Sequence, residues 1–426
     1  MGLRVAFGYR LTRFAVVAAG LAGLVGTYVI VTQPAHDPER LWQSIQADSR
    51  AQQFERAYAG MRRLLNLRPP TEDDRLTLAR LAMATGRTNE ALAQFARVSD
   101  RHPAAALARL WEGQLELRNH RARAAESSLR RALAIDPSLV EARRHLVYLY
   151  GMQRRCDDLS AQFAALAERD FLTFDQMSLW CLIGSAPWHP QEVLPILAAF
   201  VQADPDDRAS RLALAEAYGS LGEHENVEAV LKHLPATDPD ARAILARVAY
   251  DRGDAEAVES LLAHGSDDHP ILQYYRARLA ILHRDLPAAV RHFRKWTAAD
   301  PHDRNRLYML GDALVKSGKH VEGEIYLQAA RDHQALYQLI ERASTEAGRQ
   351  DLDLLKDLGA AYERVGLIPE AKAWYKLALV RDPADAGVQV ALYHLGAAAG
   401  RTVQRQSGQP AHLRVGKGDG PRGPSS

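Results

Sequence analysis

Residues 311–319 read Gly-Asp-Ala-Leu-Val-Lys-Ser-Gly-Lys, which are the residue types of a phosphate-binding loop. Such a loop holds phosphate oxygens with main-chain N–H groups and a lysine. The spacing Gly-x4-Gly-Lys-Ser/Thr is absent, however, and the glycine-rich run 416–423 follows no predicted strand. We therefore expect no nucleotide site, because Gly311 and Gly318 already suit packing and turn positions.

Histidine and cysteine could supply metal ligands or a disulfide. The 16 histidines are scattered, with no His-Glu-x-x-His motif and no His/Cys cluster at zinc spacing, so we expect no metal and no cofactor. Cys181 falls where a small buried residue belongs. Cys156 lies near the start of a preceding helix, so Cys156 and Cys181 are also a candidate disulfide in an oxidising compartment. Both interpretations stay open.

The elements that carry these residues are predicted by one regularity, a ladder of prolines spaced 34 residues apart. The prolines in this series are Pro69, Pro103, Pro137, Pro205 and Pro239, and Phe171 occupies the one position in the series where proline is absent. This period is typical of helix–turn–helix units that stack into a solenoid. A solenoid normally offers an extended surface rather than a catalytic pocket.

The residues between the prolines repeat one pattern. In the last unit it reads Leu355-x2-Leu358-Gly359-x2-Tyr362, followed by Ala371-x3-Tyr375 and Pro383. It returns at Leu307, Leu310, Gly311, Leu314, Gly323, Leu327 and Ala330, at Gly113, Ala125, Leu129, Ala132 and Pro137, and at Ala79, Ala91, Phe95, Val98 and Pro103. The pattern resembles the tetratricopeptide-repeat family over residues 38–400, except that Leu355 stands where Trp is usual.

This resemblance implies an all-α fold, a right-handed solenoid of about ten helix–turn–helix repeats. The units are expected to begin near residues 38, 72, 106, 140, 174, 208, 242, 273, 304 and 352. Gly or Ala at the eighth place and Ala at the twentieth let the two helices of a unit approach closely. Glycines such as Gly86 and Gly366 supply the turn between them, and Asp-Pro steps end the second helix.

Four features depart from the regular pattern. Residues Leu336–Gln350 are predicted to form one extra helix that breaks the register. Pro195 should kink a second helix, and Trp188 on the nearby turn either contacts a partner or covers the kink. Residues 386–400 are expected to cap the array, and the basic tail 401–426 is too poor in apolar residues to fold.

The first residues read as a membrane anchor. Phe14–Val31 is an uncharged run of 18 residues, three arginines precede it, and no acidic residue occurs before Asp37. This asymmetry predicts a cytoplasmic basic segment at 1–13 and a transmembrane signal anchor at 14–31. A cleaved signal peptide and a mitochondrial presequence are alternatives that stay open.

In the tetratricopeptide family the first helices line the concave face, at the second, fifth, ninth, twelfth and thirteenth places. Carried onto this sequence, the partner-binding residues are Trp42, Arg80, Arg118, Arg144, Tyr148, Tyr274, Arg278, Tyr308, Lys316 and Lys356. Cations interleaved with aromatic rings suit an acidic peptide, whereas Glu141 and Glu216 on the same face equally allow a mixed, solvated surface. The family's chaperone-tail clamp is not expected, since only Asn305 falls on this face.

Repeats that fill residues 38–400 leave no room for a catalytic domain, so we expect no enzyme. The sequence predicts a membrane-anchored scaffold or adaptor for protein partners, in assembly of a cell-envelope, secretion or polysaccharide-export complex. Its expected place is the bacterial inner membrane, single-pass, with the solenoid in the periplasm. The alternative is a non-catalytic regulatory subunit of a membrane-associated enzyme complex. A net charge of +2 with basic ends predicts no nucleic-acid partner.

Overall fold

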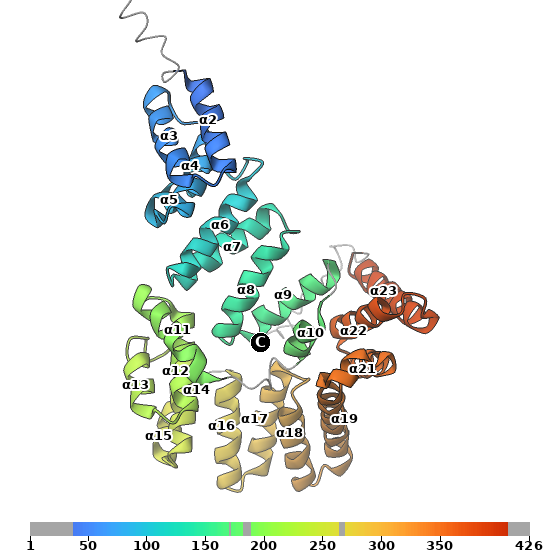
Figure 1. Cartoon of the computed structure of the whole chain (residues 1–426). Helices are drawn as coiled ribbons and strands as arrows, with labels where there is room; N and C mark the ends of the chain where they lie inside the picture. The colour runs from blue at the N-terminus through green and yellow to red at the C-terminus, as the bar shows by residue number, and fades with distance from the viewer. Residues whose placement is uncertain (1–36, 170–171, 182–188, 264–268, 408–426) are drawn as a thin grey trace, which may run out of the picture. The chain divides into compact units, whose positions relative to one another are not determined.

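The computed structural model describes residues 37–169, 172–181, 189–263 and 269–407. These residues form 22 helices, α2 to α23, and no strand (Figure 1). Their contacts divide the chain into two compact units, with the boundary between His145 and Leu146 inside α8. The all-helical class predicted from the sequence is confirmed.

Most of the helices alternate as the first and second members of hairpins. The first helices are α2 (Pro38–Arg50), α4 (Glu72–Ala84), α6 (Ala105–Arg118), α8 (Val140–Met152), α10 (Phe174–Cys181), α12 (Arg208–Ser220), α14 (Pro239–Asp251), α16 (Pro270–Leu282), α18 (Arg304–Lys316) and α21 (Leu352–Arg364). The second helices are α3 (Phe54–Leu67), α5 (Thr88–Phe95), α7 (Ala122–Ile135), α9 (Cys156–Arg169), α11 (Pro190–Ala203), α13 (His224–Leu231), α15 (Ala255–Ala263), α17 (Leu286–Ala299), α19 (His320–Ser344) and α22 (Ile368–Arg381). The predicted succession of helix–turn–helix units is therefore present.

Eight of these pairs pack as hairpins, and the close approach of their helices depends on residues without large side chains. The packed pairs are α2–α3, α4–α5, α6–α7, α12–α13, α14–α15, α16–α17, α18–α19 and α21–α22. At Gly359 an added Cβ would lie only 2.6 Å from the ring of Tyr375 in α22. The turn at Gly366 has φ +85°, a left-handed conformation that glycine adopts without strain.

Two first helices begin three residues earlier than predicted. The helices α14 and α16 start at Pro239 and Pro270, rather than near residues 242 and 273. The side chain of Asp238 accepts hydrogen bonds from the N–H groups of Asp240 and Ala241, which places the helix start there. Proline suits the first helical position because its missing N–H would have no partner within the helix.

The predicted extra helix at Leu336–Gln350 is wrong as a separate element. The helix α19 runs without a break for 25 residues from His320 to Ser344, and a short helix α20 (Glu346–Gln350) follows. Leu336, Ile340 and Ala343 are buried at helical spacing, so the apolar stripe of α19 simply continues. The break comes at Thr345, whose side chain caps α20 by accepting from the N–H of Gly348.

Several other expectations concern the ends and the irregular unit. The helix α11 continues through Pro195, and the last helix α23 (Ala386–Ser407) extends past the predicted end at residue 400. Within residues 37–407, wherever the structure describes them, no helix has the length and apolar character to cross a bilayer. The predicted anchor Phe14–Val31, Trp188 and residues 408–426 lie outside the described residues.

Within the second unit, the chain returns to its own earlier repeats. The helix α22 packs against α9 and α10, so segments about 200 residues apart lie side by side (Figure 1). The rings of Phe174 and Trp374 meet edge to face at 5.8 Å. The Nζ atom of Lys376 donates to the main-chain oxygen of Ala167, and Arg349 pairs with Asp175 at 3.0 Å. A repeat array that only touches its neighbours would lack such contacts.

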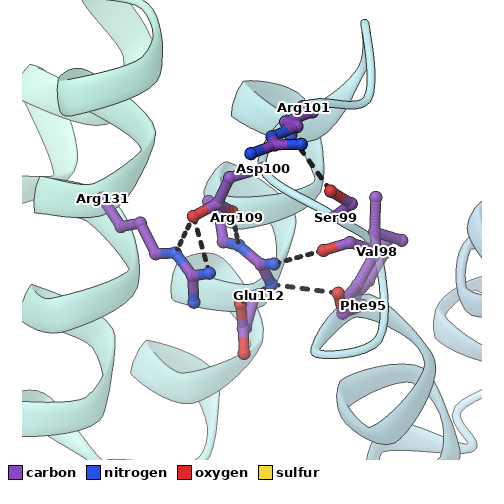
Figure 2. A network of polar contacts seen from close by, with 8 residues as sticks. All are labelled: Phe95, Val98, Ser99, Asp100, Arg101, Arg109, Glu112 and Arg131. Atoms are coloured by element: carbon purple, nitrogen blue, oxygen red, sulfur yellow. Dashed lines mark hydrogen bonds and ion pairs between the residues drawn. The ribbon is translucent and has the colours of Figure 1, made fainter.

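Consecutive repeats of the first unit are joined by a buried arginine. The side chain of Arg109 in α6 is 1% exposed, and its guanidinium donates to the main-chain oxygens of Phe95 and Val98 just after α5 (Figure 2). It also pairs with Asp100 at 3.1 Å and with Glu112 at 2.9 Å. Carbonyls at a helix C-terminus lack partners within the helix and carry partial negative charge, so a buried cation satisfies both needs.

Arginines on other first helices also donate to main-chain oxygens at the end of a second helix. Arg276 and Arg306 donate to the oxygens of Leu262 and Trp296, which end the preceding second helix. Arg211 and Arg242 donate to Val230 and Leu261 at the end of the second helix in their own hairpin. Because the start of each first helix lies beside these carbonyl ends, one arginine can hold two helices together.

We predict that replacing Arg109 with methionine lowers the free energy of unfolding by roughly 2–4 kcal/mol, because the main-chain carbonyls of Phe95 and Val98 lose their donor. The matched control is Arg131→Met, since Arg131 also pairs with Asp100 but is 52% exposed. That change should cost under about 1 kcal/mol. Urea unfolding followed by circular dichroism compares the two, and equal losses would contradict the capping role.

Candidate partner-binding surface

The first helices of the second unit form a continuous surface where α14 contacts both α12 and α16. A polar network ties their N-terminal ends together. Arg208 of α12 pairs with Asp238 at 2.7 Å and also with Asp240, at the start of α14. His269, which precedes α16, lies 2.8 Å from the other oxygen of Asp240. Side chains on these three helices are therefore held in a fixed relation.

This network shifts the titration of Asp240. Hydrogen bonding from His269, with a further contribution from Arg208, lowers the pKa of the Asp240 carboxyl to about 2. The same arrangement raises the pKa of the Arg208 guanidinium through its hydrogen bond to Asp238. Both groups are charged throughout the physiological range, so the network is a permanent electrostatic link between repeats.

In the first unit, the predicted residues lie on the first helices but differ in their availability. The guanidinium of Arg80 stacks over the ring of Trp111 at 5.2 Å, which joins α4 to α6. Arg118 and Arg144 are exposed, and Arg118 makes no hydrogen bond or ion pair with the described residues. Trp42 is half-buried against the core cluster around Ile45, so much of its ring already packs within the protein.

In the second unit, Arg278 and Tyr274 belong to a cross-repeat cluster. The Nε and Nη2 atoms of Arg278 in α16 both donate to the hydroxyl of Tyr250 in α14, at 3.0 and 2.6 Å. The guanidinium also lies over the rings of Tyr250 and Tyr274. Tyr274 packs in turn against Trp296, with ring centroids 4.7 Å apart. Arg278 therefore serves first to join α14 and α16.

The remaining predicted residues divide into paired lysines and open tyrosines. Lys316 pairs with Asp312 at 2.7 Å, and Lys356 pairs with Asp353 and Asp385 at 2.9 and 3.1 Å. Tyr148 is 44% exposed and Tyr308 is 57% exposed. Within the described part of the chain, neither tyrosine hydroxyl has a hydrogen-bond partner. These two rings are the most accessible aromatic groups of the predicted set.

The structure places the predicted contact residues on first helices, and it also shows residues that pair with them within the chain and that were not predicted from the sequence. Tyr250 was missed although it holds a lining place, the ninth, even when the unit is counted from residue 242. Counted from Pro239, Tyr250 holds the twelfth place of its unit, which is one of the lining places of the family. Gln114 was also missed: its amide donates to Glu141 at 2.7 Å and lies 3.0 Å from His145. Contact residues were chosen from the sequence by charge or aromatic character, and the neutral amide of Gln114 meets neither criterion.

The two cysteines are free thiols that line one cavity of the second unit. Burial raises the pKa of the Cys181 thiol to about 12 and also raises that of Cys156. The raised pKa values favour the protonated thiol form of both side chains at neutral pH. A bridge between Cys156 and Cys181 stays a prediction.

Comparison with known proteins agrees with the hairpin construction. Residues 76–140 match the family described as tetratricopeptide repeat. The chain thus contains tetratricopeptide repeats in this segment, and hairpins of the same construction recur through the described residues. The search of curated proteins gave no match.

Three solved structures show what the chain is similar to at low identity. The human IFIT1 dimer with m7Gppp-AAAA shares 15% identity, with 82% of this chain and 91% of that chain covered and a TM-score of 0.32. A tetratricopeptide repeat protein from Parabacteroides merdae shares 12% identity, with 57% and 98% covered and a TM-score of 0.31. The APC/C hetero-tetramer Cut9–Hcn1 shares 12% identity, with 87% and 98% covered and a TM-score of 0.29. With identities and TM-scores this low, these similarities support no conclusion about this chain.

We predict that Tyr250→Phe lowers the free energy of unfolding by about 1 kcal/mol, because the hydroxyl is the acceptor for both donors of Arg278. The control is Tyr308→Phe, which removes a hydroxyl from an exposed ring and should leave stability unchanged. Thermal and urea unfolding of the two variants are the measurement. A loss as large for Tyr308→Phe would show that the α14–α16 contact does not depend on this hydrogen bond.

The Asp240 network predicts a dependence of stability on acid. Ionised Asp240 has a lower pKa in the folded chain than the ordinary 3.8, so its stabilisation is complete above that value and is lost as the pH falls toward 2. Asp240→Asn should flatten this part of the profile. The exposed Asp206→Asn should leave the profile unchanged. Urea midpoints measured across this acidic range test it, and parallel profiles for Asp240→Asn and the unsubstituted protein would contradict it.

Proposed function

We propose that this chain is a non-catalytic scaffold or adaptor that binds a protein or peptide partner along the first helices of its tetratricopeptide hairpins. The observation that carries the proposal is a set of exposed side chains on these helices that form no hydrogen bond or ion pair with any described residue: Arg118, Tyr148 and Tyr308. Stacked helical hairpins generally act through such extended surfaces. Exposed aromatic rings and arginines are also the residue types that contribute most to protein interfaces.

The charges on these helices favour an acidic partner. Arg80 and Arg118 are exposed in the first unit, whereas Glu141 already accepts from Gln114. In the second unit, the exposed pair of Lys316 and Asp312 contributes little stability, so a carboxylate of the partner can replace Asp312 at small cost. Arginine adds directional, two-pronged contact to a carboxylate, which a lysine lacks.

The cellular setting is proposed from the sequence. An uncharged Phe14–Val31 after three arginines supports a single-pass anchor in a bacterial inner membrane, with the hairpins in the periplasm. In that place the scaffold would serve the assembly of a cell-envelope, secretion or polysaccharide-export complex. A non-catalytic subunit of a membrane-associated enzyme complex is the second candidate, and the same capture experiment separates the two.

We predict that reversing two surface charges, Arg80→Glu with Arg118→Glu, reduces capture of the partner at least about tenfold in membranes, because both cations then repel its carboxylates. Site-specific crosslinking from Tyr148 and Tyr308, followed by purification of the full chain, identifies the neighbour. The matched control is Arg63→Glu with Arg97→Glu, which changes the same charge at exposed positions away from the first helices.

Three outcomes are decisive. Loss of capture in the first double variant alone supports the proposed surface. Equal capture by both double variants, or no protein crosslinked from either tyrosine, contradicts it. If the captured neighbour is an enzyme whose activity falls when this chain is deleted, the chain is a subunit of that enzyme complex.

A further inference from the structure

The second unit contains a cavity of about 270 Å³ where its late repeats meet its early ones. One wall comes from the start of α9 and the end of α10, around Ser160 and Trp180. The others come from the joint between α17 and α18, from the middle of α19, and from the turn between α21 and α22. The cavity thus lies beside the contact that brings α22 against α9 and α10.

The charge of the lining is one-sided. Four carboxylates border the cavity, those of Asp157, Asp300, Asp303 and Glu370. Among the described residues that line it, there is no lysine or arginine. A partly enclosed site with this lining attracts positive charge, because low-dielectric walls strengthen the field of the carboxylates.

Two of the lining side chains have polar atoms without a partner. The Oε2 atom of Glu370 is buried and accepts no hydrogen bond, and burial raises the pKa of its carboxyl. His333 is 7% exposed, and neither ring nitrogen forms a hydrogen bond with the described residues. Burial, reinforced by the neighbouring His302, lowers the pKa of His333, so the ring is neutral and offers one acceptor nitrogen. Buried polar atoms are normally satisfied, so the Oε2 atom of Glu370 points to a missing donor, and the acceptor nitrogen of His333 is available to the same ligand.

Aromatic rings complete the lining. Trp180, Tyr337 and Tyr362 all border the cavity. The indole N–H of Trp180 donates to the hydroxyl of Ser160 at 3.0 Å, and the ring stacks on Phe163 at 6.1 Å between centroids, so both contacts fix the ring at the edge of the cavity. Aromatic faces attract cations, more strongly in a desolvated site. The aromatic rings and the carboxylates therefore favour the same kind of ligand.

The arrangement does not suit a metal ion. In the described part of the chain, no three of the His, Cys, Asp and Glu side chains come close enough to share one ion. Carboxylates spread around a cavity with aromatic walls instead match an extended organic cation, whose donors and carbon atoms contact different walls. The volume admits a ligand of only a few heavy atoms.

We propose that this cavity binds a small organic cation, an alkylammonium or guanidinium group, whose N–H groups donate to Glu370 and His333 between the aromatic rings. The group can come from a free diamine or guanidine, or from a lysine or arginine side chain of a protein partner. Because the walls belong to repeats far apart in the sequence, occupation of the cavity stabilises the contact of α22 with α9 and α10.

Calorimetric titration of the full chain with agmatine and putrescine tests the proposal, with uncharged butanediol as the control ligand. We expect binding of the two cations, a rise in melting temperature with their concentration, and no binding of butanediol. Glu370→Gln and His333→Gln should each weaken binding at least about tenfold, because each removes an acceptor for the cation. The matched control Glu341→Gln removes the same charge from an exposed position on α19 and should bind as the unsubstituted chain does.

A second arm distinguishes the source of the cation. Acetyl-arginine methylamide and a short arginine-containing peptide are titrated in parallel, and binding of these alone assigns the cavity to a partner's side chain. Folding is checked by melting temperature: Glu370→Gln should be at least as stable as the unsubstituted chain, since it removes an unpaired buried carboxylate. The proposal is overturned if no cation of either source binds, or if Glu341→Gln weakens binding as much as Glu370→Gln does.

Discussion

The structure depends on the buried arginines that cap the carbonyl ends of the second helices. Every helix ends in main-chain oxygens that its own hydrogen-bond ladder cannot reach, and in a stack of hairpins these ends are pressed against the next repeat. Arg109, Arg211 and Arg242 are almost fully buried there, each donating to carbonyls of a neighbouring helix. A buried charge of this kind is tolerated only because carbonyls and carboxylates surround it. Arg109 thereby joins adjacent hairpins, whereas Arg211 and Arg242 hold the two helices of their own hairpin together.

This capping has a consequence for the first helices. Their inner ends are fixed by the arginines, and their exposed faces are joined by contacts such as Arg80 on Trp111 and Arg278 on Tyr250. Several residues that look like partner contacts are therefore already engaged between repeats. What remains for a partner is a smaller set, with Arg118, Tyr148 and Tyr308 the clearest members. A surface held rigid in this way loses little entropy when a partner binds.

Much of this fold could be predicted from the sequence, because a 34-residue period and the small residues at fixed places specify each hairpin locally. The predicted start of α14 near residue 242 was three residues too late: Pro239 follows the 34-residue period, but the capping side chain of Asp238 makes this proline the first residue of the helix. The sequence does contain a signal for these arginines. Arg75, Arg109, Arg143 and Arg211 recur at multiples of 34 residues, as the prolines do. They were not predicted to be buried, because arginine is usually exposed and a recurring arginine therefore suggests a solvent-exposed helix face.

The return of α22 to α9 and α10 had no signal in the sequence, and the reason is physical. Periodicity reports which residues face a neighbouring repeat, whereas Phe174 on Trp374 and Lys376 on Ala167 join segments that share no repeat boundary. These contacts occur beside the two least regular elements, the short α10 and the extended α19. A uniform stack of repeats would not form such a cavity, because each unit contacts only its neighbours. The enclosed acidic cavity is therefore a product of the irregular repeats, whereas the first-helix surface is a product of the regular ones.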